Sequence, residues 1–306
     1  MIVVTGGKGF IGGNLIKKLE KSYEEVICLD IVDDSLENIN KWLVENAIKI
    51  DFIFHLGANT DTTEMNVEIF NKYNLESSKF IWNLCTTYGI PLVYASSAAT
   101  YGDGEEGFDD EAPIDNLKPL NPYGQSKQDF DLWVQKQIST PPFWAGLKFF
   151  NVYGIGELKK EKMSSMILQL HAQMISNIGS KVKLFKSHKE GYGDGEQKRD
   201  FIYVDDIVKV CIFFMENSCH VNVNSGIYNL GTGKARTFND VVSILWRRGG
   251  NPNIEYIDIP IEIRDKYQYF TEAKMKKLRN IGYLDAFTDI EHGIPDYLKK
   301  LLYETR

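Results

Sequence analysis

Tyr123 and Lys127 stand four residues apart in the sequence. On a helix this spacing places both side chains on one face. An ammonium group beside a phenol lowers the phenol's pKa, so such a tyrosine serves as a general acid and base near neutral pH. The pair occurs by chance in many proteins and is a weak signal alone. It predicts proton transfer at a hydroxyl or carbonyl oxygen of a substrate.

A serine-rich segment ahead of this pair strengthens the interpretation. Residues 94–102 read Tyr-Ala-Ser-Ser-Ala-Ala-Thr-Tyr-Gly, and an apolar run at 91–95 predicts a buried strand there. Ser97 lies at the end of that strand, where its hydroxyl can hydrogen-bond a substrate oxygen beside Tyr123. Together with the dinucleotide site that the glycine motif described next predicts, these side chains predict hydride chemistry at a carbinol carbon.

A glycine-rich motif near the start of the chain predicts that dinucleotide site. Gly6, Gly9 and Gly12 follow the apolar run 2–4 directly, in the order Thr-Gly-Gly-Lys-Gly-Phe-Ile-Gly. The first two glycines allow a pyrophosphate to approach backbone N–H groups, and the third allows the helix to pack against the strand. Asp30 ends the next apolar run, 18 residues beyond Gly12, where a carboxylate can bind the adenosine ribose. This order is typical of a βαβ dinucleotide-binding unit.

Strands and helices alternate through the first half of the chain. Apolar runs predict strands at 52–54, 91–95 and 146–150, and helical patterns lie near 66–88 and 123–137. Such alternation predicts an α/β fold, a Rossmann-type doubly wound parallel sheet with a smaller α/β substrate domain.

Shorter elements follow residue 154 and predict the smaller domain. They are a helix at 163–178, a surface loop at 185–199, strands at 226–230 and 254–259, a helix capped by Thr237, and a last helix at 290–303. We expect the dinucleotide-binding domain to comprise 1–150 with about 202–226 and 267–279, and the substrate domain to comprise about 151–201, 227–266 and 280–306.

Composition narrows the class of protein. The 306 residues are 43% apolar, 12% aromatic and 25% charged, which excludes disordered, collagen-like and coiled-coil chains. The net charge of −7 disfavours a nucleic-acid partner, and the longest apolar stretch is too short to span a membrane. Four cysteines in largely apolar surroundings and the lack of a basic leader predict a cytoplasmic protein with buried thiols. The histidines lack ligand-like spacing, so we expect no metal.

Four motifs occur in the order and spacing of a known superfamily: the glycine motif, the serine segment at 96–102, Asn-Pro-Tyr-Gly-Gln-Ser-Lys at 121–127 and Asn-Val-Tyr-Gly at 151–154. The chain resembles the extended short-chain dehydrogenases/reductases from end to end. Within that superfamily it is most similar to the ADP-L-glycero-D-manno-heptose 6-epimerases. Residues 54–64, 151–166, 198–204, 229–233 and 267–271 carry this closer resemblance.

The resemblance implies an isomerase that inverts C6″ of ADP-D-glycero-D-manno-heptose, a precursor of the lipopolysaccharide core. A tightly bound NADP would take hydride from C6″ and return it to the opposite face of the transient ketone. NAD is the alternative, because the residues after Asp30 supply no base for a 2′-phosphate. The family also implies a homo-oligomer. Another nucleotide-sugar epimerase, of the UDP-hexose 4-epimerase type, and a non-catalytic dinucleotide-binding sensor are the other candidate functions.

The resemblance also implies roles for individual residues. Tyr123 and Lys160 would be the two acid/base groups, with Lys159 and Lys162 as alternatives to Lys160, and Ser97 and Lys127 would complete the catalytic set. The cofactor-binding residues would be Gly6, Gly9, Phe10, Ile11, Gly12, Asp30, Leu56, Gly57, Ala58, Asn59, Thr60, Asn74, Lys127, Val152 and Lys160. The substrate-binding residues would be Ser97, Asn151, Lys162, Gln169, Phe185, Arg199 and Tyr267.

Two segments depart from the family pattern. Only 43 residues separate Gly12 from His55, and residues 31–50 supply one helix, at 38–47. We therefore predict that the third strand of the sheet is missing, together with the adenine-side loop and the lysine that favours NADP in the family, either because the sheet is truncated or because a segment is absent from this sequence. The loop at 187–195 is longer than the family pattern and lies near the expected sugar-nucleotide site.

Overall fold

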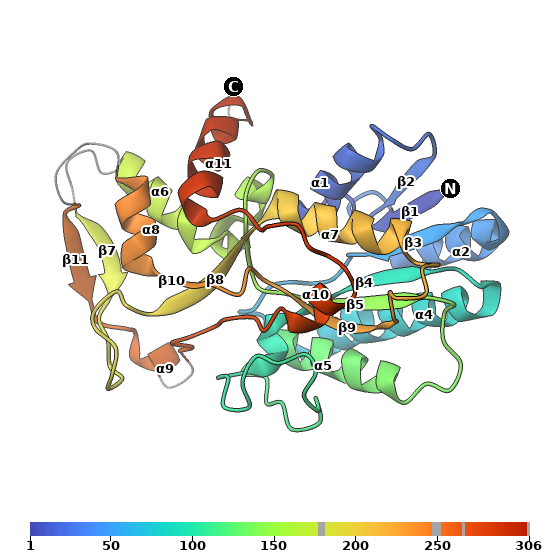
Figure 1. Ribbon diagram of the computed structural model, residues 1–306, viewed down its shortest axis with the longest axis horizontal. Helices are drawn as coiled ribbons and strands as arrows, with labels where there is room; N and C mark the ends of the chain where they lie inside the picture. Colours follow the sequence, from blue (N-terminus) through green and yellow to red (C-terminus); the bar gives the residue numbers. More distant parts are fainter. Residues whose placement is uncertain (177–180, 247–251, 265–266, 305–306) are drawn as a thin grey trace.

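A computed structural model describes residues 1–176, 181–246, 252–264 and 267–304. Its main layer is a six-stranded parallel sheet in the order β2-β1-β3-β4-β5-β9 (Figure 1). The strands are β1 (Ile2–Thr5), β2 (Val26–Leu29), β3 (Phe52–His55), β4 (Leu92–Ser97), β5 (Trp144–Phe149) and β9 (Gly226–Leu230). The predicted doubly wound parallel sheet is confirmed.

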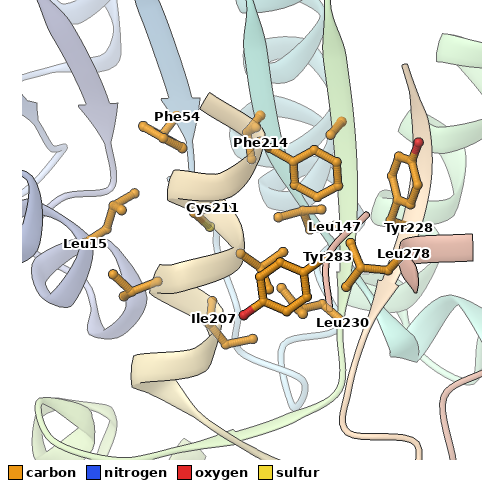
Figure 2. Close-up of a cluster of buried hydrophobic side chains, with 14 of the residues drawn as sticks. Leu15, Phe54, Leu147, Ile207, Cys211, Phe214, Tyr228, Leu230, Leu278 and Tyr283 are labelled. Carbon is orange, nitrogen blue, oxygen red and sulfur yellow. The ribbon is translucent and has the colours of Figure 1, made fainter. Parts of the chain in front are cut away.

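Helices cover both faces of this sheet. On one face lie α1 (Phe10–Leu19) and α7 (Val204–Glu216), where Leu15, Phe54 and Phe214 are buried together (Figure 2). On the other face lie α2 (Leu36–Asn46), α4 (Ser77–Tyr88) and α5 (Pro122–Gln135), which bury Trp82 and Phe130 against the strands. The side chains of a strand alternate between the two faces. Central strands therefore need apolar residues at successive positions, which explains their continuous apolar runs.

Strand β2 forms one edge of the sheet. Within the described residues no further strand pairs with it, and between β2 and β3 lie only α2 and the short 3-10 helix η1 (Ala47–Lys49). The predicted absence of a third strand is confirmed. Helix α2 begins at a cap, because the Ser35 hydroxyl accepts a hydrogen bond from the Asn38 N–H. The turn after β2 leaves Ile31 and Val32 exposed.

A second, smaller layer lies at the left of Figure 1, beyond the carboxyl ends of the main strands. Its strands are β6 (Asn151–Tyr153), β8 (Lys198–Tyr203) and β10 (Ala235–Thr237) in one sheet, and β7 (Val182–Phe185) and β11 (Ile254–Ile257) in another. Helices α6 (Met166–Ser176), α8 (Phe238–Leu245) and α11 (Ile290–Glu304) pack around them. Thr237 caps α8 as predicted, in a reciprocal capping box with Asp240.

Short helices complete the chain. They are α3 (Val67–Phe70), η2 (Asn71–Glu76), η3 (Ala98–Tyr101), η4 (Glu157–Met163), α9 (Ile261–Arg264) and α10 (Lys276–Asn280). Among the described residues, no helix is both long enough and apolar enough to cross a membrane.

Several predictions from the sequence were wrong in detail. Residues 227–230 were placed in the substrate domain, but β9 pairs with β5 and completes the main sheet, a long-range pairing that a strand pattern does not specify. Helix α6 begins at Met166 rather than at residue 163, and the end of the predicted helix, at 177–178, lies outside the described residues. Arg199 lies in β8 and not in a loop. Cys28 and Cys219 are exposed, because each lies at an edge of the fold rather than in its core.

Candidate active site

Two adjoining cavities open at the carboxyl ends of the main strands. The glycine-loop cavity, of about 440 Å³, is lined by the glycine motif, the end of β2 and the turn after β3. The tyrosine cavity, of about 480 Å³, is lined by the end of β4, the first turns of α5 and residues of the smaller layer. Six residues line both cavities: Phe10, Ile11, Leu56, Ala58, Thr60 and Lys160. The two cavities are therefore one continuous site.

The glycine motif forms a cradle that fits a pyrophosphate. Gly6 has a φ of 70°, and a Cβ there would lie 2.5 Å from the backbone of Gly57. A Cβ at Gly12 would lie 2.2 Å from the carbonyl oxygen of Gly6. No side chain caps α1 at Gly9, so the first N–H groups of the helix have no side-chain acceptor. These groups could bind the phosphates of a dinucleotide.

Asp30 follows β2 and lines the same cavity. Its carboxylate is nearly buried and accepts hydrogen bonds from the backbone N–H groups of Lys8 at 2.9 Å and Val32 at 3.1 Å. The Lys8 ammonium group pairs with Asp33 instead. Leu36 and nearby apolar residues line the wall beyond. This end of the cavity could hold the flat face of a nucleoside's base, and the Asp30 carboxylate could accept a hydrogen bond from the ribose of that nucleoside.

The predicted catalytic residues come together in the tyrosine cavity. Ser97 ends β4, and Tyr123 and Lys127 lie on successive turns of α5, which Asn121 caps by accepting a hydrogen bond from Gly124 N–H at 2.8 Å. Burial raises the pKa of the Tyr123 phenol, and its hydrogen bond with Ser97 offsets part of this rise.

The lysine beside this tyrosine differs from the expectation. Burial lowers the pKa of Lys127 to about 8, and its ammonium group donates to the Ala95 carbonyl oxygen at 2.8 Å. The pKa of Tyr123 is nevertheless raised in this structure, because removal from water disfavours the phenolate, so the net lowering expected beside Lys127 is not seen.

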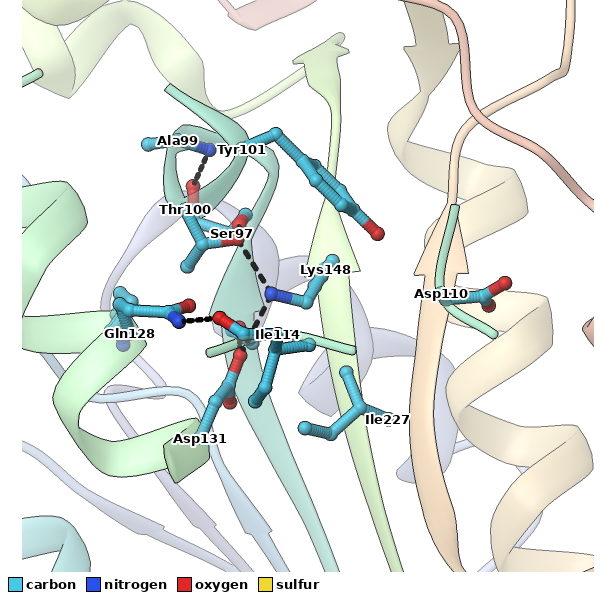
Figure 3. Close-up of polar contacts among 12 residues, drawn as sticks. Ser97, Ala99, Thr100, Tyr101, Asp110, Ile114, Gln128, Asp131, Lys148 and Ile227 are labelled. Carbon is cyan, nitrogen blue, oxygen red and sulfur yellow. Dashed lines mark hydrogen bonds and ion pairs between the residues drawn. The ribbon is translucent and has the colours of Figure 1, made fainter. Parts of the chain in front are cut away.

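A buried polar network lies behind the strand that carries Ser97 (Figure 3). The Lys148 ammonium group lies 3.0 Å from an Asp131 carboxylate oxygen, and both side chains are fully buried. Asp131 also accepts hydrogen bonds from Tyr94 at 3.0 Å and Ser96 at 2.6 Å, and Lys148 donates to the hydroxyl of Thr100 at 2.6 Å. The network ties α5, β4, β5 and η3 together, and it fixes the backbone on either side of Ser97.

Two further buried side chains shape the turn after β3. His55 bonds Thr5 at 2.7 Å and Ser78 at 2.9 Å and lines the glycine-loop cavity, and burial lowers its pKa to about 3, so it is neutral. The amide of Asn74 bonds the backbone of Asn59 through both its oxygen and its nitrogen. Asn74 and Asn59 line neither cavity; they fix the loop at 57–60 instead.

Lys160 lies at the junction of the two cavities. It is half-buried in η4, and its ammonium group lies 5.9 Å from the centroid of the Phe10 ring. Burial lowers its pKa, and the charge of Glu157 partly offsets this. Lys159 and Lys162 are exposed, and each lines only one cavity. Among the three lysines, only Lys160 lines both the glycine-loop cavity and the tyrosine cavity.

Arg199 lies between two aromatic rings in the tyrosine cavity. Its guanidinium carbon is 5.6 Å from the centroid of Phe238 and 5.5 Å from that of Tyr267. No carboxylate lies within 4 Å of it in the described part of the chain, and burial lowers its pKa. A half-buried guanidinium without a carboxylate partner can bind a diphosphate in bidentate fashion.

The remaining predicted residues divide between the two cavities and the surrounding structure. Asn151, Val152 and Gln169 line the tyrosine cavity, whereas Phe185 lies behind Tyr267, with ring centroids 5.6 Å apart. The sequence interpretation missed Thr62, Glu157, Ser165 and Phe238, which also line this cavity. The cap at Thr237 marked the start of a helix but gave no sign that the next residue stacks on Arg199. Within the described ranges, no group of three or more His, Cys, Asp or Glu side chains could hold a metal ion.

Comparison with known proteins places this site in a family. The family model described as the NAD dependent epimerase/dehydratase family matches residues 2–231, which include both cavities' glycine, serine, tyrosine and lysine motifs. The chain belongs to the NAD-dependent epimerase/dehydratase family. This membership confirms the resemblance that the sequence motifs carry, and a nicotinamide dinucleotide is the cofactor that the family uses.

Individual members of this family align with almost the full length of the chain. It is 42% identical to an ADP-L-glycero-D-manno-heptose-6-epimerase of Fusobacterium nucleatum, with 99% of this chain and 98% of that protein covered. That alignment spans 331 positions, 25 more than the 306 residues here, so the relative has at least 25 residues with no counterpart. A surplus of this size agrees with a missing strand and loop after β2.

Solved structures of the family agree with the fold. The crystal structure of the Helicobacter pylori ADP-L-glycero-D-manno-heptose-6-epimerase superposes with a TM-score of 0.77 at 30% identity, covering 98% of this chain and 96% of that one. The Thermus thermophilus UDP-glucose 4-epimerase in complex with NAD has a TM-score of 0.74 at 22% identity, with 97% of each chain covered. The second likeness concerns the fold alone.

Proposed function

We propose that the protein inverts the configuration at C6″ of ADP-D-glycero-D-manno-heptose to give ADP-L-glycero-D-manno-heptose, a precursor of the lipopolysaccharide core. The observation that carries the proposal is that Tyr123 and Lys160 line one cavity, and that this cavity is continuous with a dinucleotide cradle. An epimerase must handle a proton in two orientations of its ketone intermediate, and so needs two acid/base groups. The names of the full-length relatives support the heptose substrate.

Each part of the site would bind a different part of the cofactor or of the substrate. The glycine motif and the start of α1 hold the pyrophosphate of the cofactor, and Asp30 holds its adenosine ribose. When bound, the cofactor accepts and returns the hydride of C6″. Tyr123 holds the proton of the C6″ oxygen in one orientation of the sugar, and Lys160 holds it in the other. Ser97 hydrogen-bonds the same oxygen, and Arg199 binds the diphosphate.

For the cofactor, the resemblance implied NADP with NAD as the alternative, and the geometry supports NAD. The 2′-phosphate of NADP would approach Asp30 and Asp33, and the Lys8 ammonium group beside them already pairs with Asp33. Strand β2 is the edge of the sheet in the described residues, so the segment that carries the NADP lysine in the family has no counterpart. Denaturing the purified protein and identifying the released dinucleotide by mass tests this. Release of NADP contradicts it.

The activity is tested by incubating the protein with ADP-D-glycero-D-manno-heptose and following C6″ by NMR. We expect inversion with no added cofactor, loss of at least about 100-fold in rate for Tyr123→Phe, and a similar loss for Lys160→Met. Lys183→Met, at an exposed lysine that lines neither cavity, is the control and leaves the rate within about threefold of the original. Turnover of a UDP-hexose instead of the heptose supports a 4-epimerase, and bound dinucleotide without turnover of either sugar supports a sensor.

We also infer a cytoplasmic homo-oligomer with no nucleic-acid or membrane partner. The acidic net charge and the composition support this, as does the family resemblance. Size-exclusion chromatography with light scattering measures the assembly, and a monomer at micromolar concentration contradicts it.

A further inference from the structure

One buried carboxylate closes the loop that carries Lys160. The Glu157 side chain is 1% exposed and accepts hydrogen bonds from the N–H of Gly154 at 3.0 Å and the hydroxyl of Ser165 at 2.9 Å. It also accepts one from the N–H of Ser165. The partners lie at the two ends of the segment 155–164. A single side chain thus joins the start and end of this loop, and Lys160 lies between them.

The loop is held in a conformation that an unrestrained chain would avoid. Glu161 has a φ of 46° and a ψ of −114°, and among the described residues it is the only one other than glycine with a positive φ. Such a backbone costs about 1–3 kcal/mol and persists only where its surroundings enforce it. Helix α1 contributes to the enforcement, because the Asn14 amide donates to the Ile155 carbonyl oxygen at 2.7 Å.

We propose that Glu157 is the positioning residue for Lys160: its carboxylate fixes the loop at the junction of the two cavities, and its charge is the one that acts on the half-buried lysine. The catalytic meaning of this inference rests on the function proposed above for Lys160. The structural part, that one carboxylate fixes the loop that carries this lysine, stands on the contacts of Glu157 alone.

The charges around the pair favour this assignment. Burial lowers the pKa of Lys160, and Glu157 is the group that raises it. Burial raises the pKa of Glu157, while hydrogen bonds from Ser165, Gly154 and the Tyr297 hydroxyl of α11 lower it. All of these groups are neutral, and the side chains that α1 brings to the loop, Phe10 and Asn14, are uncharged. No lysine or arginine lies within 4 Å of the Glu157 carboxylate in the described part of the chain, so its charge is not cancelled by an ion pair.

The test measures the charge of Lys160 directly, without cofactor or substrate. Lysines are reductively methylated with ¹³C-formaldehyde, the dimethyl-lysine resonance of Lys160 is assigned by its loss in Lys160→Arg, and its chemical shift is followed with pH. We expect Glu157→Gln to lower the pKa of Lys160 by about 1 unit. Glu157→Asp keeps the negative charge, so the pKa of Lys160 in this variant should lie closer to that in the original protein. Glu161→Gln is the matched control: it removes an exposed carboxylate one residue from Lys160 and shifts the pKa by less than about 0.3 unit.

The pH dependence of C6″ inversion provides the second readout. In a plot of rate against pH, we expect the part of the curve that reflects the titration of Lys160 to move to lower pH in Glu157→Gln and to return in Glu157→Asp. A merely structural defect would instead lower the rate equally at every pH. An unchanged Lys160 titration in a folded Glu157→Gln protein overturns the inference. If the original protein inverts no heptose, the proposed function fails, but the titration still decides the role of Glu157.

Discussion

Replacing one of two adjacent glycines in α1 tests the dinucleotide cradle most directly. A Cβ at Gly12 would lie 2.2 Å from the carbonyl oxygen of Gly6 and 2.9 Å from the Cα of Gly7. Both neighbours are backbone atoms of the turn that would face the pyrophosphate, so neither can rotate away. A Cβ at Gly13 meets only the carbonyl oxygen of Gly7, at 3.3 Å, which a shift of a few tenths of an ångström relieves.

The two substitutions share every effect except this contact. Each replaces a helical glycine by alanine, which favours the helix by about 1 kcal/mol. Gly12→Ala additionally forces the glycine turn and α1 apart, which costs about 1–3 kcal/mol of stability. The separation also moves the N–H groups at the start of α1 away from the phosphates. Loss of two charge-assisted hydrogen bonds, at about 1.5 kcal/mol each, predicts at least about 100-fold weaker dinucleotide binding.

The assay is a titration of each variant with NAD, after removal of any bound dinucleotide, with circular dichroism to verify folding. We expect Gly13→Ala to bind within about threefold of the original protein and to melt at the same or a higher temperature. Gly12→Ala should bind at least about 100-fold more weakly while still folded. If both variants bind equally well, the assignment of the glycine turn to the pyrophosphate is wrong.

Three further predictions concern buried and strained groups. Lys148→Met leaves Asp131 as an unpaired buried charge and should destabilise the protein by about 3–5 kcal/mol, whereas Lys148→Met with Asp131→Leu should recover at least half of that in urea unfolding; equal losses would contradict a coupled pair. His55 stays neutral in the folded state, with a pKa of about 3, whereas in the unfolded chain it binds a proton below pH 6.5. The contribution of His55 to the free energy of unfolding is therefore complete above pH 6.5 and is lost as the pH falls towards 3. The stability difference between the original protein and His55→Gln should therefore shrink by about 2 kcal/mol from pH 7 to pH 5, and a constant difference would refute the neutral assignment. The Glu161→Gly protein should be more stable than the Glu161→Ala protein by about 1 kcal/mol, because only glycine relieves the positive φ. At most positions alanine is the more stabilising of the two residues, and thermal melting of both variants decides between these outcomes.

Local patterns account for the elements that the sequence predicted well. Helix α1 follows the glycine motif as the βαβ pattern predicts, because the glycine turn ends at its first residue and its apolar spacing is that of a helix. The start of α8 follows from the hydroxyl and carboxylate of Thr237 and Asp240, three residues apart. The missing third strand also follows from counting, since residues 31–50 contain one helix and too few residues for more.

Features that depend on distant partners could not be predicted in this way. The strand at 226–230 has the right pattern for either sheet, and only its pairing with β5 places it in the main one. The sequence left three lysines as candidates for the second acid/base group, and only Lys160 lies at the junction of the cavities. The expected effect of Lys127 on Tyr123 failed for a similar reason: spacing placed the two on one helix face, but burial by other segments decides the sign of the pKa shift.

The sequence by itself determined the glycine cradle, the serine–tyrosine–lysine set and the truncated edge of the sheet, because each depends on residues that are close along the chain. The tertiary structure alone decided the partners of Glu157, the aromatic rings around Arg199 and the ion pair of Lys148 with Asp131. These arrangements join residues from separate elements. Burial and charge act through space, so their effect on a side chain follows from the fold and not from its neighbours in sequence.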